Sequence, residues 1–432
     1  MSAPASPTAA LLAFAGADHV LPDAARADAA RLLADTLAVG AAGAMAPGAE
    51  AIRTTAEAMG AGGDARLIGS PGRLPAPAAA FVNGYRVHCL EWDAVHEPAV
   101  VHALSTVVAA LGAAIDRRGG CEPDEALVAL AVGVDIAAGL GLAATSGLTF
   151  FRPATAGVIG AALAAARIDG APLDDTLGLA YSSAAGTMQP HVEGLATLPF
   201  QIANAARAAI TASDLARAGF PGPRDPLEGE FGYFRLFDSG DLASYTRGLG
   251  KVWRIGEVSV KPFPSGRASH AALGKLQELA LAPDAVDRIE LACPPLVRRL
   301  VARPYRPGMT PAYARLCLQW LGALMLVDGV VDPRRFTPAH MADERLAGLA
   351  RRIALVPDGN EDPNALFPQR LTVTFADGRR ESHDIAHTLG SPGNPLTRAQ
   401  AQAKHDLARD LAPADADPRI FDDPLAYFTG QP

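Results

Sequence analysis

Cysteine is scarce in this sequence. The chain of 432 residues has only four, Cys89, Cys121, Cys293 and Cys317, and no two of them form a CxxC pair. This spacing suggests no disulfide framework, so we expect reduced thiols in a cytoplasmic protein. The N-terminal stretch MSAPASPTAALLAFAGADHV has no charged residues ahead of its short apolar segment, so we also expect no signal peptide.

Basic runs and uninterrupted apolar spans are also missing. The net charge is -8, whereas a nucleic-acid-binding protein needs a basic face and an anionic membrane attracts a polybasic patch. The longest apolar stretch, ALVALAVGVDIAAGLGLAA, is interrupted by Asp135, and a membrane span needs about 20 apolar residues without such a charge. We therefore expect a buried helix there, and neither a nucleic-acid nor a membrane partner.

Lysine is rare as well: of 38 basic residues only Lys251, Lys261, Lys275 and Lys404 are lysines, which leaves 34 arginines. A coding bias toward arginine removes the lysines that arginine can replace. A lysine that survives is therefore a candidate for a role that needs an ammonium group able to give up its proton.

The sequence is rich in apolar residues: 49% of the residues are hydrophobic and only 19% are charged. The length favours two domains, and the composition suits an oligomer. Long Ala/Leu/Val runs without β-branched alternation predict helices up to residue 255 and again after SPGNPLT. Three segments predict strands: RIGEVSVKPF, Asp287–Cys293, and the hairpin RLTVTFADGRRESHDI around Asp377-Gly378.

These patterns predict a mainly α fold. A large all-helical domain takes residues 1–255 and is completed by residues 394–432. A smaller α+β domain takes residues 256–393.

The first candidate site is the segment HCLEWDAVHEPAVVH (88–102), which holds His88, Glu91, Asp93, His96, Glu97 and His102 between apolar flanks. Because proline disfavours helix in the residue before it, Glu97-Pro98 predicts a break between two helices. We expect His88 and Glu91 to share a helical face, and His96 and His102 to flank a polar pocket.

Two other interpretations of this segment stay open. In the first, His88 and Glu91 are buried polar groups whose hydrogen bonds are made within the protein core, and His96 is simply exposed to solvent. The other is a metal site, but the spacing H-x7-H-x5-H matches no common zinc motif, so no metal is expected.

The second candidate is KPFPSGRASH (261–270), in which prolines and a glycine stiffen a turn that presents Lys261, Arg267 and His270 at the domain junction. The alternative is an ordinary surface loop. The third is FFRPATAG, where Arg152 lies at the start of a small-residue helix and offers a fork for a carboxylate. The sequence has no GxSxG, no P-loop and no GxGxxG after a strand, so no cofactor is expected.

These segments resemble the MmgE/PrpD family, which includes 2-methylcitrate dehydratases, cis-aconitate decarboxylases and iminodisuccinate epimerases. The family pattern NG…H.LD(F/Y)DD…H appears here as Asn83-Gly84, His88, Leu90, Glu91, Trp92, Asp93 and His102. The family's Lys-Pro-aromatic-Pro loop appears as residues 261–264, and DPLEGEFGYF, LCLQWLGALMLVDG and GNPLT also resemble family segments. The resemblance implies a helical domain with an α+β lid, a homodimer, and a cleft site that needs neither metal nor nucleotide.

The chain departs from the family at several of these positions. Glu91 stands where an aspartate is common, and Ala94 and Val95 replace an aspartate and a threonine of the decarboxylases. Arg152, Leu198 and Gly266 stand where the decarboxylases have a histidine, a lysine and a second histidine. These differences disfavour decarboxylation.

The family's reactions form a carbanion beside a carboxylate, which needs fixed positive charge and a positioned base. We expect a dehydratase-like lyase for a small hydroxylated di- or tricarboxylic acid, with an epimerase as the alternative and a catalytically silent scaffold as a third hypothesis. Arg152, Lys261 and Arg267 are expected to bind carboxylates, and His102 or Lys261 to act as base. Asp93 or His96 orients that base or protonates the leaving hydroxyl. Asn83, Glu91, Gln201 and His270 complete the expected substrate-binding set.

Overall fold

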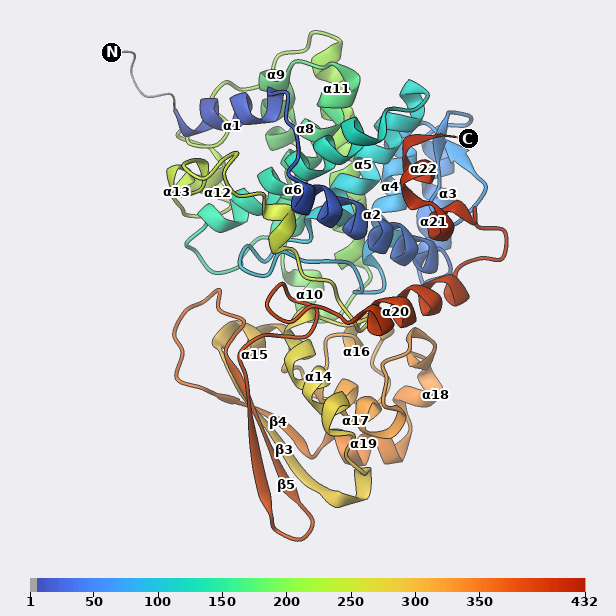
Figure 1. Cartoon of the computed structure of the whole chain (residues 1–432), viewed down its shortest axis with the longest axis vertical. Coiled ribbons are helices and arrows are strands. Elements are labelled where there is room, and N and C mark those ends of the chain that lie inside the picture. The colour runs from blue at the N-terminus through green and yellow to red at the C-terminus, as the bar shows by residue number, and fades with distance from the viewer. Residues whose placement is uncertain (1–5, 432) are drawn as a thin grey trace.

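The helices of the first 250 residues form one body in the computed structural model, which describes residues 6–431 (Figure 1). They are α1 (Pro7–Gly16), α2 (Asp23–Gly43), α3 (Ala49–Met59), α4 (Ala76–His88), α5 (Ala103–Arg118), α6 (Pro123–Ala143), α7 (Arg152–Thr155), α8 (Gly157–Asp169), α9 (Leu173–Ser182), α10 (Gln189–Glu193), α11 (Thr197–Arg217), α12 (Tyr233–Leu236) and α13 (Leu242–Thr246). The mainly α fold is thereby confirmed.

Small residues let these helices approach closely. A Cβ atom on Gly160 of α8 would lie 2.3 Å from the carbonyl oxygen of Gly133 on α6, so the two backbones touch where the helices cross. In the part of the chain that is described, α6 alone is long and apolar enough to cross a membrane. Its residues are buried among α2, α5 and α8, which is the environment of a core helix.

The helical body is not free of strands. Ala65–Arg66 (β1) and Arg73–Leu74 (β2) pair as a short antiparallel hairpin between α3 and α4. The expectation of an all-helical region is wrong at this point, because two-residue strands are too short to give a periodic pattern.

The second half of the chain carries a four-stranded sheet in the order β4-β3-β5-β6. The strands are β3 (Val286–Cys293), β4 (Ile353–Pro357), β5 (Gln369–Phe375) and β6 (Arg380–Ile385). The pair β3/β4 is parallel, and β3/β5 and β5/β6 are antiparallel. Two predicted elements are confirmed here: the strand at 287–293, and the hairpin at Asp377-Gly378, where Gly378 takes a φ of 87°.

Short helices occupy much of residues 254–350 around these strands. They are η1 (Arg254–Glu257), η2 (Arg267–Ser269), α14 (His270–Leu279), η3 (Pro283–Ala285), α15 (Pro295–Val301), α16 (Pro311–Ala314), α17 (Leu318–Asp328), η4 (Pro333–Arg335), α18 (Pro338–Met341) and α19 (Glu344–Ala350). The first of them, η1, packs against α2 and α6 of the helical body. Residues 254–263 form η1 and a single bridge between Ser259 and Val95, so the predicted strand RIGEVSVKPF is wrong. The alternating pattern misleads because Val258, Ser259, Val260 and Lys261 are all buried, whereas a half-exposed strand would bury every second residue.

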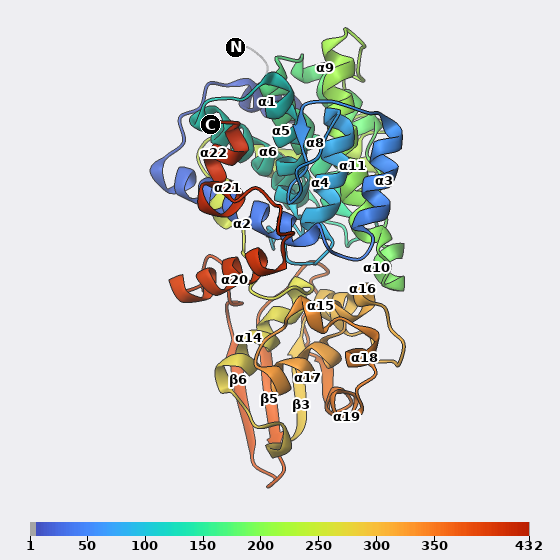
Figure 2. The ribbon, with the colours of Figure 1, turned by 90° about the vertical axis from the view of Figure 1, so that its right-hand side faces the viewer.

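The C-terminal helices return to the helical body (Figure 2). They are α20 (Arg398–Leu411), α21 (Arg419–Asp422) and α22 (Pro424–Thr429). Helix α20 begins with a capping box between Thr397 and Gln400 and packs against α2, where Lys404 Nζ lies 2.6 Å from Asp35 Oδ1. Both views show α20 between the helical body and the region of the sheet.

The crossing of α6 and α8 gives a test of the fold. Gly160→Ala should lower the free energy of unfolding by about 1–3 kcal/mol, because the added methyl group overpacks the crossing. Gly348→Ala is the matched control: it lies in α19, nothing lies within 4 Å of its added Cβ, and it should stabilise by about 0.5–1 kcal/mol. Thermal and urea unfolding measure both changes, and equal effects at the two positions would contradict the observed packing.

Candidate active site

The loop between α4 and α5 carries most of the site. Helix α4 ends at His88, and Glu91 has a φ of 53°, so the chain turns sharply out of the helix. The prediction that His88 and Glu91 share a helical face is therefore wrong. The turn nevertheless keeps the two side chains close, with His88 Nε2 3.6 Å from Glu91 Oε1.

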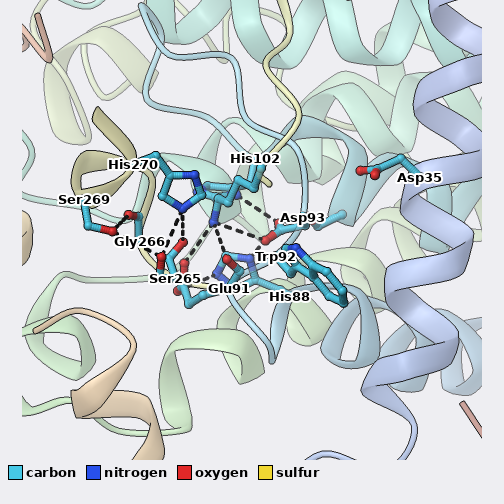
Figure 3. Close-up of polar contacts among 12 residues, drawn as sticks. Asp35, His88, Glu91, Trp92, Asp93, His102, Ser265, Gly266, Ser269 and His270 are labelled. Atoms are coloured by element: carbon cyan, nitrogen blue, oxygen red, sulfur yellow. Dashed lines mark hydrogen bonds and ion pairs between the residues drawn. The ribbon is translucent and has the colours of Figure 1, made fainter. Parts of the chain in front are cut away.

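Asp93 is the centre of the cluster (Figure 3). Its side chain is fully buried, and its Oδ2 accepts hydrogen bonds from His88 Nδ1 at 2.8 Å, from His102 Nδ1 at 2.9 Å and from the Ser105 hydroxyl. Burial alone would raise the pKa of Asp93, but His102, His88 and Lys261 hold this pKa well below its usual range. The carboxylate is therefore ionised and serves as an acceptor for two imidazoles.

Lys261 brings the second predicted segment to the same place. Its Nζ donates to the Glu91 carbonyl at 3.0 Å and to Glu91 Oε2 at 3.2 Å, and it lies 3.6 Å from Asp93 Oδ1. Although burial would raise the pKa of Glu91, Lys261, His88 and His102 lower it to about 2. The ammonium group thus neutralises two buried carboxylates of the protein. Since it is fully buried in the wall, it is not placed to bind substrate directly as expected.

His88 and His102 differ in charge although both bond to Asp93. Burial would lower the pKa of His88, but Asp93 and Glu91 outweigh it and raise that pKa, which favours an imidazolium. Burial dominates for His102 and lowers its pKa, which favours the neutral ring. The two rings meet edge to face with their centroids 4.9 Å apart. The two shifts therefore favour a cationic ring at His88 and a neutral ring at His102 on one carboxylate.

A small cavity of about 70 Å³ adjoins His102 and His88. His102 Nε2 has no hydrogen-bond partner among residues 6–431, and it retains accessible surface. Much of the remaining wall is apolar, including Leu148, Phe151, Met188, Leu198, Leu300 and Leu316. A second cavity of about 290 Å³ shares His88, Glu91, Leu198 and Leu316 with the first. The ring of His102, whose Nε2 has no partner among residues 6–431, thus borders a mainly apolar cavity of the size of a small ligand group.

Arg267 also lines the smaller cavity, but it is engaged. Its Nη2 lies 2.7 Å from Glu97 Oε1, and its Nη1 donates to the Leu389 carbonyl at 2.7 Å. The Ser259 hydroxyl also donates to Glu97. Only the buried Nε of Arg267 lacks a partner among the described residues. Arg267 therefore holds the loop that contains Glu97, and it is not the free carboxylate clamp that the sequence suggested.

Arg152 is the clearest correction. It is buried and contacts Asp238, with Nη2 2.8 Å from Oδ1 and Nε 3.1 Å from both carboxylate oxygens. It lines neither cavity. A buried arginine is satisfied by a nearby carboxylate, and no motif around Asp238 indicates that it provides one.

Asn83 and Gln201 bind backbone rather than ligand. Asn83 accepts from the Ile68 amide at 2.8 Å and donates to the Arg66 carbonyl at 2.9 Å. Gln201 accepts from the amide of Thr187 at 2.6 Å and donates to its carbonyl at 3.1 Å. Neither lines a cavity beside His102, and in the described structure both hold loops.

His96 and His270 are also held by partners within the fold, although the buried Nδ1 of His270 has none among residues 6–431. His96 Nε2 lies 2.9 Å from Glu257 Oε2, and its Nδ1 accepts from the Ala99 amide at 3.2 Å. His270 Nε2 contacts the hydroxyl and carbonyl of Ser265 at 3.1 and 3.2 Å, which fixes the turn that follows Lys261. Both rings lie outside the two cavities.

Two residues of the site escaped the sequence analysis. Ser105 lies three residues after His102, and this spacing would have signalled it once α5 was known to begin at Ala103. His191 lines the cavity from the short helix α10, and its Nε2 lacks a partner among residues 6–431. Burial, with help from Arg303, lowers the pKa of His191 to about 4. Nothing in the sequence around His191 distinguished it.

His88, Asp93 and His102 also satisfy the spacing of a metal site, with ligand atoms within 4.8 Å of one another. Both Nδ1 atoms, however, point at one oxygen at hydrogen-bond distance, and the Lys261 ammonium already lies beside the other oxygen. A divalent cation would have to displace these protons and sit next to that ammonium. The arrangement therefore favours a hydrogen-bonded cluster of His88, Asp93 and His102 over a metal site. Elemental analysis of purified protein, which should find no stoichiometric metal, tests this.

Known sequence families account for nearly the whole chain. The profile of the MmgE/PrpD N-terminal domain matches residues 15–246, and that of the MmgE/PrpD C-terminal domain matches residues 263–421. The chain belongs to the MmgE/PrpD family. The resemblance inferred from the two motifs is thereby confirmed.

Three relatives in the MmgE/PrpD family are identical to this chain at about a quarter of the aligned residues. A "cis-aconitate decarboxylase-like protein oryM" from Aspergillus oryzae is 28% identical over 398 residues, covering 83% of this chain and 81% of the relative. The human cis-aconitate decarboxylase is 27% identical over 360 residues, covering 77% and 72%. The mouse protein of the same name is 26% identical over 358 residues, covering 77% and 71%.

The buried charges of this MmgE/PrpD site give a stability prediction. Lys261→Met should lower the free energy of unfolding by about 3–5 kcal/mol, because Glu91 and Asp93 would lose their shared cation. The double variant Lys261→Met/Glu91→Gln removes one of the unpaired charges and should recover part of the loss. Thermal unfolding compares the two, and a double variant no more stable than the single one would contradict the pairing.

Proposed function

We propose that this protein is a cofactor-independent lyase that dehydrates a small hydroxylated di- or tricarboxylic acid, with His102 as the base. The observation that carries the proposal is the geometry of His102. Its Nδ1 is bound to buried Asp93, and its Nε2 faces a mainly apolar cavity without a protein partner among residues 6–431. A neutral imidazole held in this way is suited to take a proton from a carbon next to a carboxylate.

Asp93 supports this step in two ways. By accepting from Nδ1–H it keeps the proton on that nitrogen and leaves the Nε2 lone pair free. When His102 takes a proton, the nearby carboxylate stabilises the imidazolium that forms. The raised pKa of His88 favours an imidazolium at the border of the cavity, and this positive charge would stabilise the developing carbanion.

His88 is the best-placed acid for the leaving hydroxyl. Its raised pKa favours the protonated ring, it borders both cavities, and its Nε2 has no hydrogen-bond partner in the described structure. Asp93 is unsuited to this role because its pKa is held low, and His96 because it is bound to Glu257. In the proposed reaction His102 Nε2 takes the α-proton, and His88 donates a proton to the β-hydroxyl, which leaves as water.

Decarboxylation is the second candidate, because two of the relatives named above are cis-aconitate decarboxylases and the third is named as decarboxylase-like. Leu198 and Gly266 weigh against it. Both line the small cavity, and the family resemblance places a lysine and a histidine there in decarboxylases. Epimerisation stays open as well, since it shares the first proton transfer and differs only in how the carbanion is quenched.

Turnover in deuterated water separates the three reactions. Incubation with hydroxylated and unsaturated tricarboxylic acids and with epimerisable dicarboxylic acids is followed by NMR. Loss of water to give an alkene supports dehydration, and release of carbon dioxide supports decarboxylation. Deuterium exchange without an alkene supports an epimerase. The absence of all three reactions over the whole panel would contradict the proposal.

His102→Gln should reduce kcat by at least about 100-fold, because a positioned general base contributes about that factor or more. His383→Gln, on strand β6 away from both cavities, is the matched control and should leave kcat unchanged. Steady-state kinetics of the active reaction measures both. Near-normal kcat in the His102 variant, with its unfolding temperature preserved, would remove His102 from the mechanism.

The pH profile follows from the sign of the His102 shift. Its pKa is lowered from 6.5 by burial, so the ring is a free base at neutral pH, and the acid limb of kcat/KM should lie below pH 6.5. Asp93 opposes burial and raises this pKa, so Asp93→Asn should move the acid limb to still lower pH while reducing kcat. An acid limb centred above pH 7, or one that Asp93→Asn leaves in place, would contradict the assignment.

A further inference from the structure

Arg315 is a buried cation that lacks an anionic partner. It follows α16, is only 4% exposed, and its guanidinium donates no hydrogen bond to any of residues 6–431. The other buried arginines described above are engaged: Arg152 with Asp238 and Arg267 with Glu97. Glu91 acts on Arg315 only over a distance longer than an ion pair. Arg315 therefore has unused hydrogen-bond donors in a dry environment.

The guanidinium borders the cavity of about 290 Å³. This space shares His88, Glu91, Leu198 and Leu316 with the cavity beside His102, so the two cavities adjoin along one wall. A molecule that places its reacting carbon at His102 would reach Arg315 by extending past His88, across the residues that the two cavities share. The larger cavity also meets Thr310 and Pro311 on the side of α16.

The position of Arg315 is fixed by its surroundings. Phe336 packs its ring 4.7 Å from the guanidinium carbon, and the Gly266 amide donates to the Arg315 carbonyl at 2.9 Å. A Cβ atom on Gly266 would lie 2.5 Å from Leu316 Cδ2, so the glycine lets residues 315–316 approach the Lys261 loop. The cation is therefore built into the same wall as the catalytic loops.

The positive charge of Arg315 favours an anionic ligand in the cavity that it borders. Burial lowers the pKa of Arg315 because the charged form is desolvated without a partner. An anion that enters the cavity would supply the missing partner, and the planar fork of a guanidinium matches a carboxylate in a bidentate pair.

We infer that Arg315 binds a carboxylate of the substrate that is remote from the reacting carbon, so that the enzyme selects acids with at least two separated carboxylates. This inference rests on the proposed function for the identity of the reacting end. Arg315 acts on binding, whereas His102 acts on the proton.

Binding of two unreactive acids tests the inference. Tricarballylate carries three carboxylates and neither a hydroxyl group nor a double bond, and butyrate carries one carboxylate. Calorimetric titration compares the wild type with Arg315→Met and Arg315→Lys. Arg306→Met is the matched control, because Arg306 stacks on Tyr313 at 4.2 Å but lines neither cavity.

The dissociation constant of tricarballylate should rise at least about tenfold in Arg315→Met, less in Arg315→Lys, and not at all in Arg306→Met. Butyrate binding should be equally weak in all four proteins. Arg315→Met should unfold at the same or a higher temperature without ligand, because an unpaired buried charge is removed. Unchanged tricarballylate affinity in Arg315→Met overturns the inference, as does a fall in unfolding temperature without any loss of affinity.

The test also separates this inference from the proposed function. Repeating the titration in a His102→Gln background should reproduce the dependence on Arg315. Should His102→Gln keep its activity while Arg315→Met loses affinity, the proposed base is wrong and the carboxylate subsite stands. Should the wild type bind neither tricarballylate nor butyrate, the subsite is wrong, and the role of His102 is still decided by its own kinetics.

Discussion

The hydrogen bonds that converge on the buried carboxylate of Asp93 are the constraint on which the site depends. One oxygen accepts from two imidazoles and a hydroxyl, and the other faces the Lys261 ammonium. A buried anion is stable only if such partners surround it. The same bonds give the two histidines opposite tendencies in charge, so the stability of the cluster and its proposed chemistry have one physical origin.

The fold brings these partners together from distant parts of the chain through tryptophan and lysine contacts. Trp92, in the loop after α4, donates from its ring nitrogen to the Pro262 carbonyl at 3.2 Å and so joins the loop of Asp93 to the loop of Lys261. Lys404 of α20 donates to the Trp92 carbonyl at 3.2 Å and pairs with Asp35 of α2. Helix α20 thus supports the loop that carries Asp93. Of the four lysines, the two that are buried, Lys261 and Lys404, both hold the loop of Asp93.

The sequence predicted what periodicity and motif chemistry determine. It predicted a mainly helical fold, the hairpin at Asp377-Gly378, and the meeting of the His88–His102 segment with the Lys261 loop. It did not predict partners that only tertiary structure supplies. Arg152 has the composition of an anion receptor, yet Asp238 occupies its fork. His191 and Arg315 carry no local pattern, because what distinguishes them is the absence of a partner in a cavity, and a cavity has no signature in the sequence.

We propose that Asp93 holds His102 as a neutral imidazole, with its proton on Nδ1 and with Nε2 unprotonated. Nitrogen-15 NMR of histidine-labelled protein at pH 7 tests it most directly, with the His102 signals assigned by their loss in His102→Gln. In the wild type we expect a protonated Nδ1 and an unprotonated Nε2. In Asp93→Asn the His102 ring should revert toward the ordinary mixture of the two tautomers. A His102 that carries its proton on Nε2, or that is fully protonated at this pH, would contradict it.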